Sequence, residues 1–222
     1  MEPTPKIAGR RRPPEPRWPA LVAVVATGGL YSALHVDLIV GPRWLLPAVL
    51  GALLVPTVMS HRAGRHDLNR LFGLSVTSVI TLGLIGSVIL LIGALPSHRQ
   101  SPTALLLSAT SLWFTNILVF ALWYWRLDAG GPHGRDARWR HTQGAFLFPQ
   151  MTLPPGAEVM RDQPNWSPHF FDYLFLAFNT STAFSPTDTP TLTRWAKLLM
   201  MLQSLISLTV LALLAARAVN ML

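Results

Sequence analysis

Residues 170–222 read FFDYLFLAFNTSTAFSPTDTPTLTRWAKLLMMLQSLISLTVLALLAARAVNML, and this stretch decides how the rest of the chain is interpreted. The apolar run 170–178 is too short to cross a bilayer, which takes about 20 residues of helix. A polar segment, 179–188, follows it, and a long apolar stretch then runs from about Pro190 to the C-terminus. This order predicts a half-helix, a polar elbow and a final spanning helix, a layout found in membrane pores and transporters.

The composition indicates a membrane protein. Half of the 222 residues are hydrophobic and only 13% are charged, whereas a soluble domain carries about 25% charged residues. The formal net charge is +8. Its basic residues lie in short runs between apolar blocks, which is typical of cytoplasmic loops rather than of a nucleic-acid surface. We therefore expect membrane lipids as partners and no nucleic acid.

Four further apolar segments precede the half-helix, and each predicts a transmembrane helix. Residues 1–19 are basic and proline-rich, which predicts a disordered cytoplasmic tail that touches anionic headgroups. Residues 126–169 form a long polar connector, and its apolar island at 145–149 should lie along the interface or cover the half-helix. The sequence thus predicts an all-α polytopic bundle, with five spans plus a re-entrant or short aromatic half-helix before the last span. The first four spans are expected at 20–40, 45–59, 71–95 and 104–125.

The distribution of lysine and arginine predicts the orientation. With the N-terminus inside, the cytoplasmic segments carry thirteen basic residues and the outer connectors carry two. We therefore expect a multi-pass protein of the cell (plasma) membrane with a cytoplasmic N-terminus. The half-helix then either enters from the cytoplasmic side and returns, or residues 170–184 cross completely and bring the C-terminus inside. The re-entrant arrangement is preferred.

Local signals mark the half-helix and its elbow. Ser167 before Pro168 is typical of a helix N-cap followed by proline in the first turn, and Asp172 lies where a helix dipole favours an acid. In the fourth span, Asn116 is expected to bond between helices. The elbow supplies hydroxyl, amide and carboxylate groups that could line a pore. These candidates are Asn179, Thr180, Ser181, Thr182, Ser185, Thr187 and Asp188.

The segment that ends in the last helix resembles the pore module of two-helix potassium channels. The matching positions are Tyr173, Phe175, Phe178, Ser181, Thr182, Asp188, Pro190 and Arg194. In place of the Gly-Tyr-Gly filter stands the run Phe184-Ser185-Pro186. Proline cannot adopt the backbone angles that the glycines supply, so a carbonyl filter of that kind is not expected. The whole chain also resembles bacterial multi-pass membrane proteins that carry a domain of unknown function, which implies no known activity.

Two functional hypotheses follow. In the first, the chain is a pore-like or transporter-like module, and its polar elbow lines a pathway for an ion or small solute. In the second, it is a non-conducting membrane scaffold or accessory subunit, and the elbow only closes the fold. Either could form a homo-oligomer or bind a membrane partner subunit.

An enzyme is not expected, because no nucleophile, base and orienting group occur at a usable spacing. Cysteine is absent from the chain, which excludes disulfides and thiolate metal sites. The histidines His61 and His66 are five residues apart and do not share a helix face, so no metal site is expected. No cofactor is implied.

Overall fold

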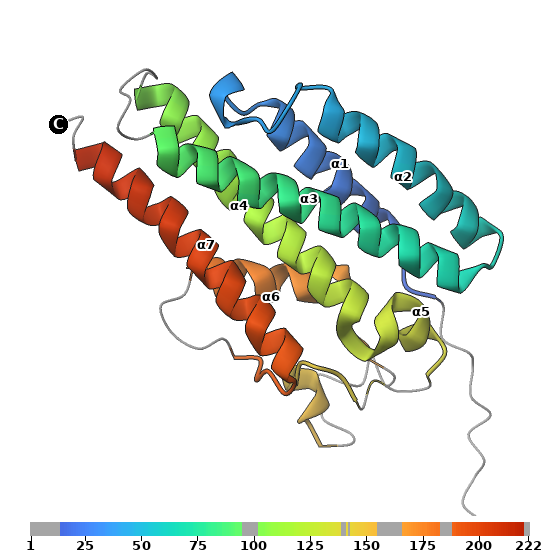
Figure 1. Ribbon diagram of the computed structural model, residues 1–222. Coiled ribbons are helices and arrows are strands. Elements are labelled where there is room, and N and C mark those ends of the chain that lie inside the picture. Colours follow the sequence, from blue (N-terminus) through green and yellow to red (C-terminus); the bar gives the residue numbers. More distant parts are fainter. Residues whose placement is uncertain are drawn as a thin grey trace, which may run out of the picture.

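The chain folds into a bundle of long helices, and most of its short helices lie at one end (Figure 1). The computed structural model describes residues 14–94, 102–138, 141, 143–154, 166–182 and 188–219. The elements within these ranges are α1 (Trp18–Ser32), η1 (Val36–Leu38), α2 (Leu45–Arg62), α3 (His66–Ala94), α4 (Pro102–Leu127), η3 (Asp128–Gly130), α5 (Gly131–Asp136), η4 (Pro149–Met151), α6 (Phe170–Thr182) and α7 (Arg194–Val219).

The structure confirms an all-α fold for the described part of the chain. Among the described residues, four helical stretches are long and apolar enough to cross a membrane. They are α2, α3, Thr103–Asp136 (nearly all of α4 followed by η3 and α5) and α7. The first helix is shorter than the predicted span 20–40: α1 has 15 residues and ends at Ser32. Beyond it the chain turns through η1. The Tyr31 hydroxyl fixes this turn by accepting a hydrogen bond from the Val40 N–H at 2.9 Å.

Helix α4 is the centre of the bundle and packs against α1, α3, α6 and α7. In the most apolar 18-residue part of the stretch that includes α4, 67% of the residues are buried. The corresponding share is 22% in α2 and in α7. Large apolar side chains such as Leu112, Phe120 and Leu122 are fully enclosed along it. The outer helices instead expose leucine, valine and phenylalanine side chains, as helices in contact with lipid do.

The start of the last helix differs from the prediction. Helix α7 begins at Arg194, not near Pro190. The residues before it are extended and pair with the apolar island: the Leu192 N–H donates to the Ala145 carbonyl at 2.7 Å, and the Leu147 N–H donates to the Pro190 carbonyl at 2.9 Å. The island supplies backbone partners at this point, so the helix cannot begin earlier.

One end of the bundle gathers most of the described charged residues, and we call it the basic end. It holds the start of α1, the turn between α2 and α3, α5, and the starts of α6 and α7 (Figure 1). A sharp reversal after α4 forms it. Gly130 and Gly131 have φ angles of +83° and +80°, and a Cβ at Gly131 would lie 2.7 Å from the Arg126 carbonyl oxygen. Only glycine fits such a turn without strain.

Candidate functional site

Helix α6 continues through the first half of the predicted elbow. It ends at Thr182 rather than at residue 178, so Asn179, Thr180, Ser181 and Thr182 are helical. The hydroxyls of Thr180 and Thr182 donate back to the carbonyls of Leu176 and Phe178 at 2.8 and 3.1 Å, so they find their partners within the helix. Of the remaining candidates, Asp188 is exposed. Ser185 and Thr187 lie outside the described residues.

The end of α6 is enclosed by polar side chains of its neighbours. Gln203 of α7 is fully buried, and its amide donates to the Ala177 carbonyl at 2.6 Å and to the Ser181 hydroxyl at 2.8 Å. Its amide oxygen accepts from the Tyr124 hydroxyl of α4 at 2.5 Å. Asn116 of α4 donates to the Gln203 carbonyl at 3.1 Å. One glutamine therefore joins α4, α6 and α7.

A second bridge closes the same region. The Ser207 hydroxyl of α7 donates to the Ser181 carbonyl at 2.7 Å and accepts from the Trp113 indole of α4 at 3.1 Å. The last carbonyls of a helix have no partner within the helix, so they need partners from elsewhere when they are buried. We call this set the polar seam. It comprises Trp113, Asn116, Tyr124, Ala177, Ser181, Gln203 and Ser207.

The start of α6 is fixed at the basic end. The helix begins at Phe170, and the His169 N–H donates to the Asp172 carboxylate at 2.7 Å. Asp172 therefore completes the N-terminal cap at this point, later than the predicted Ser167 start. Burial raises the pKa of Asp172, and the bond from His169 opposes this rise.

Tyr173 links α6 to the end of α4. Its hydroxyl donates to the buried Asp128 carboxylate at 2.5 Å, and the Ala145 N–H donates to the same carboxylate at 2.5 Å. Burial raises the pKa of Tyr173; the nearby Asp128 carboxylate adds to the rise, and Arg135 opposes it. The phenol therefore stays protonated and acts as a donor. Phe146 and Phe148 of the apolar island pack edge-on against the Tyr173 ring, so the island covers the start of α6.

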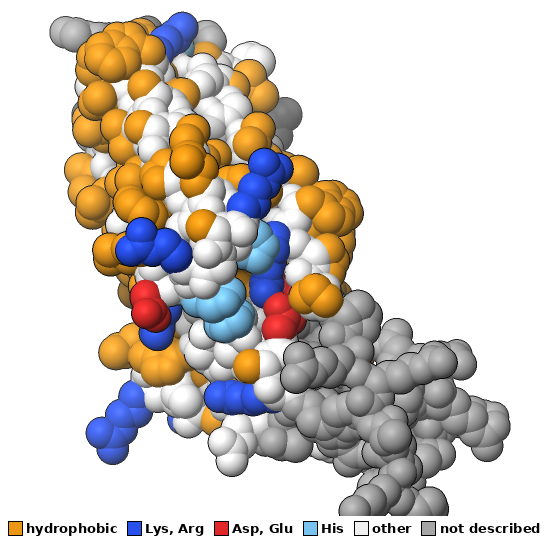
Figure 2. All heavy atoms as spheres, turned by 90° about the vertical axis from the view of Figure 1, so that its right-hand side faces the viewer, with side chains coloured by type: hydrophobic (Ala, Val, Ile, Leu, Met, Phe, Trp, Pro, Cys, Tyr) orange, Lys and Arg blue, Asp and Glu red, His pale blue; other side chains and the backbone are white. Residues whose placement is uncertain are grey.

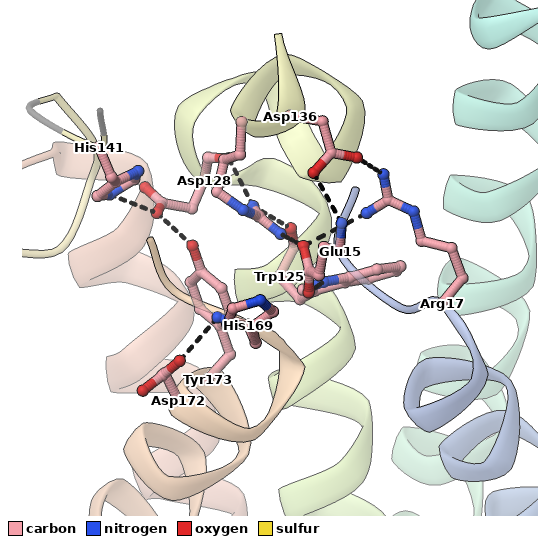
Figure 3. Close-up of polar contacts among 10 residues, drawn as sticks. Glu15, Arg17, Trp125, Asp128, Asp136, His141, His169, Asp172 and Tyr173 are labelled. Atoms are coloured by element: carbon pink, nitrogen blue, oxygen red, sulfur yellow. Dashed lines mark hydrogen bonds and ion pairs between the residues drawn. The ribbon is translucent and has the colours of Figure 1, made fainter. Parts of the chain in front are cut away.

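A buried ionic cluster joins the N-terminal segment to α4 and α5 (Figure 3). The Glu15 carboxylate accepts from the Trp125 indole at 2.6 Å and from Arg135 at 3.0 Å. Arg17 donates to Glu15 at 3.3 Å and also pairs with Asp136. Each acid in the cluster has partners, which is the condition under which buried charges are tolerated. Sequence reasoning assigned residues 14–17 to a disordered tail; in the structure they are anchored by these bonds.

The second notable feature at the basic end is a cavity of about 430 Å³, which we call the basic cavity. It lies among α1, α2, α3, the end of α4 and α5. Figure 2 views this end of the molecule and shows lysine, arginine and histidine side chains gathered between hydrophobic surfaces. Its charged and histidine lining residues are Arg17, His61, Arg62, His66, Asp67, Arg70, Arg126 and His133.

Among the described residues there is no group of three or more histidine, aspartate or glutamate side chains placed to hold a metal ion. His66 and His133 instead stack, with ring centroids 3.4 Å apart. The chemistry that the basic end offers is charge recognition. Sequence reasoning placed the basic residues in loops but did not predict that they enclose a cavity; an arginine at the end of an apolar span, Arg126, was the available signal.

Comparison with known proteins identifies no relative. No protein-family model, no curated protein and no solved structure matches the chain. The resemblances to a potassium-channel pore module and to bacterial membrane proteins of unknown function stay predictions.

Proposed function

We propose that this protein is a non-conducting membrane scaffold or accessory subunit with five transmembrane passes and a re-entrant helix, α6. The observation that carries the proposal is the polar seam. The Gln203 amide and the Ser207 hydroxyl, which a pore could present to a solute, bond instead to the last turns of α6. Among the side chains of the seam, only the Asn116 amide oxygen has no partner in the described part of the chain. Polar groups that are satisfied within the protein stabilise packing and have no need of water.

The positions of the two ends of α6 support a re-entrant helix. Its first residue, Phe170, packs against Trp125 near the basic end of α4, with ring centroids 5.9 Å apart. Phe178 packs against Trp113, 12 residues earlier along α4, with centroids 6.1 Å apart. Helical rise places these two levels about 18 Å apart, roughly half of a bilayer. The chain is back at the basic end by Thr191, which pairs with Phe146.

The N-terminal segment supports a fifth pass. Helix α1 starts at the basic end, where Glu15 and Arg17 contact Asp136. Eight residues after α1 ends, the chain lies near the C-terminal end of α3, away from the basic end, and there the Val40 side chain lies against Gly86. A helix of 15 residues rises about 22 Å, so the turn through η1 completes the passage. The excess of basic residues at the basic end supports a cytoplasmic N-terminus and a plasma-membrane location.

Flux measurements in liposomes test the proposal against the pore-like hypothesis. The reconstituted wild-type protein should conduct potassium, sodium, chloride and protons no faster than empty liposomes, and Asp188→Ala should behave identically. Flux in the wild type that Asp188→Ala reduces would contradict the proposal and favour a pathway along the elbow.

The partner of such a scaffold is either a second copy or another membrane protein. Phe171 and Phe175 of α6 expose 59% and 64% of their surfaces, which leaves an apolar face available to lipid or to a neighbouring subunit. Purification in mild detergent should therefore yield a homo-oligomer or a fixed partner. A protein always isolated alone as a monomer would contradict this part of the proposal.

A further inference from the structure

The basic cavity contains a half-buried cation, Arg126, for which the described residues supply no counterion. The Nε atom of Arg126 is buried and has no hydrogen-bond partner. Its guanidinium lies over the Trp125 ring at 5.4 Å and against the backbone of α3. A Cβ at Gly73 would come within 1.7 Å of Arg126 Nη1, so the missing side chain at Gly73 is what gives the guanidinium room.

Further cations surround Arg126. Arg62 and Arg70 lie at the rim of the cavity, where both are exposed, and neither forms an ion pair with any described residue. Arg17 also lines the cavity but is already paired with Glu15 and Asp136. Asp67 is the single acid in the lining. The cavity therefore holds three unpaired guanidinium groups and one carboxylate.

This contrast with the neighbouring ionic cluster points to a ligand. At Glu15 and Arg135 the charges are matched within the protein. At Arg126 no described residue forms an ion pair, and an unpaired charge that is partly withdrawn from water is costly unless an ion of opposite sign neutralises it. A guanidinium presents a planar fork of donors that fits the oxygens of a phosphate group.

We propose that the basic cavity binds a phosphate group, with Arg126 at its base and Arg62 and Arg70 at its rim. The cavity has the size of a small-ligand site. Apolar side chains also line it, Leu21, Val58 and Leu74 among them, and they suit a ligand with an attached hydrocarbon. Basic pockets between transmembrane helices on the cytoplasmic side bind anionic lipid headgroups. The phosphate therefore belongs either to such a lipid or to a free phosphate ion, and the inference does not depend on whether the protein conducts.

Lipid binding to the purified full-length protein tests this directly. Native mass spectrometry in detergent would measure the fraction that retains phosphatidylglycerol, with phosphatidylcholine as the zwitterionic comparison. Wild type should retain phosphatidylglycerol preferentially, and Arg126→Gln should weaken retention about tenfold, the change expected on losing a charged hydrogen-bond pair. The rim double variant Arg62→Gln/Arg70→Gln, at exposed positions, keeps the test valid if Arg126→Gln fails to fold, and should weaken retention several-fold.

A matched control removes the same charge from the same end of the molecule. Arg194 and Lys197 are exposed at the start of α7 and lie outside the cavity, so Arg194→Gln/Lys197→Gln should retain lipid as wild type does. A parallel arm adds inorganic phosphate at constant ionic strength and follows thermal unfolding. Stabilisation by phosphate that the rim variant loses, without preferential lipid retention, would assign the site to the free ion. Equal lipid retention in all variants, together with no phosphate effect, would overturn the proposal.

Discussion

The polar seam and the basic cavity both bring polar side chains into an apolar bundle, and they treat them in opposite ways. In the seam, the amide of Gln203 makes three side-chain bonds and bridges three helices. In the cavity, Arg126 has a cation–π contact and an unpartnered Nε. This difference shows that a polar side chain within an apolar bundle is not by itself a sign of function. Groups that have hydrogen-bond partners within the protein, such as the Gln203 amide, stabilise the fold. The guanidinium of Arg126, which pairs with no described acid, is available to a ligand.

Gln203→Leu should have the largest effect on this comparison. The change removes the bonds to Ala177, Ser181 and Tyr124 and leaves their polar atoms buried without partners. We expect a loss of about 3 kcal/mol in the free energy of unfolding, since each unsatisfied buried group costs about 1–3 kcal/mol. Denaturant titration in detergent micelles would measure it. Met201→Leu, two residues earlier on α7 and 62% exposed, should change stability by less than about 0.5 kcal/mol. Equal effects of the two variants would show that the seam is not a stabilising network.

Gly73→Ala should give the next largest effect, at the cavity. The new methyl group would collide with the guanidinium of Arg126, and we expect a loss of about 1–3 kcal/mol together with weaker phosphate binding. Gly51→Ala in the middle of α2 is the control, since nothing lies within 4 Å of its Cβ position. That change should instead stabilise the protein by about 0.5–1 kcal/mol, because alanine is the better helix former. Thermal unfolding would measure the midpoint of each variant. A shift of both midpoints in the same direction would contradict the placement of Arg126 against Gly73.

Trp113→Phe should have a smaller effect within the seam. The phenyl ring keeps most of the packing but loses the indole bond to Ser207 at 3.1 Å. The expected loss is about 1 kcal/mol, the net contribution of a typical hydrogen bond. Trp44→Phe, at a position that is 67% exposed, should leave the unfolding midpoint unchanged. No shift for Trp113→Phe would indicate that Ser207 does not need this donor.

Arg126→Gln should have the smallest effect on the free energy of unfolding. It therefore distinguishes the basic cavity, as a binding site, from the polar seam, as a stabilising network. Arg126→Gln removes a cation that no described residue neutralises, so in phosphate-free detergent the free energy of unfolding should fall by less than about 1 kcal/mol or rise. Arg194→Gln serves as the exposed control. A loss comparable to that of Gln203→Leu would mean that Arg126 is part of the structural network.

The sequence predicts the long helices well because apolar runs are local signals. Residues 45–59, 71–95 and 104–125 all fall within or close to α2, α3 and α4. The prediction that Asn116 bonds between helices is confirmed by its contact with Gln203. The predicted boundary of the elbow was wrong. Helix α6 continues to Thr182, and the hydroxyls of Thr180 and Thr182 bond to carbonyls of that same helix.

The two sites themselves could not be derived from the sequence, since each depends on partners far apart along the chain. Tyr124 and Gln203 are 79 positions apart, and Glu15 and Arg135 are 120 apart. Nothing local indicates that Gly73 gives room to Arg126. A glutamine inside an apolar helix and an arginine at the end of one were visible signals, but only the packing of α4 determines that the first is satisfied and the second is not.

Cysteine accessibility tests the central claim most directly, and the wild-type chain has no cysteine to interfere. A membrane-impermeant maleimide would be applied from each side to Ser181→Cys in the seam and to His61→Cys in the cavity. The account predicts rapid labelling of His61→Cys from the cytoplasmic side and no labelling of Ser181→Cys from either side. Labelling of Ser181→Cys at a comparable rate would place water in the seam and contradict the account.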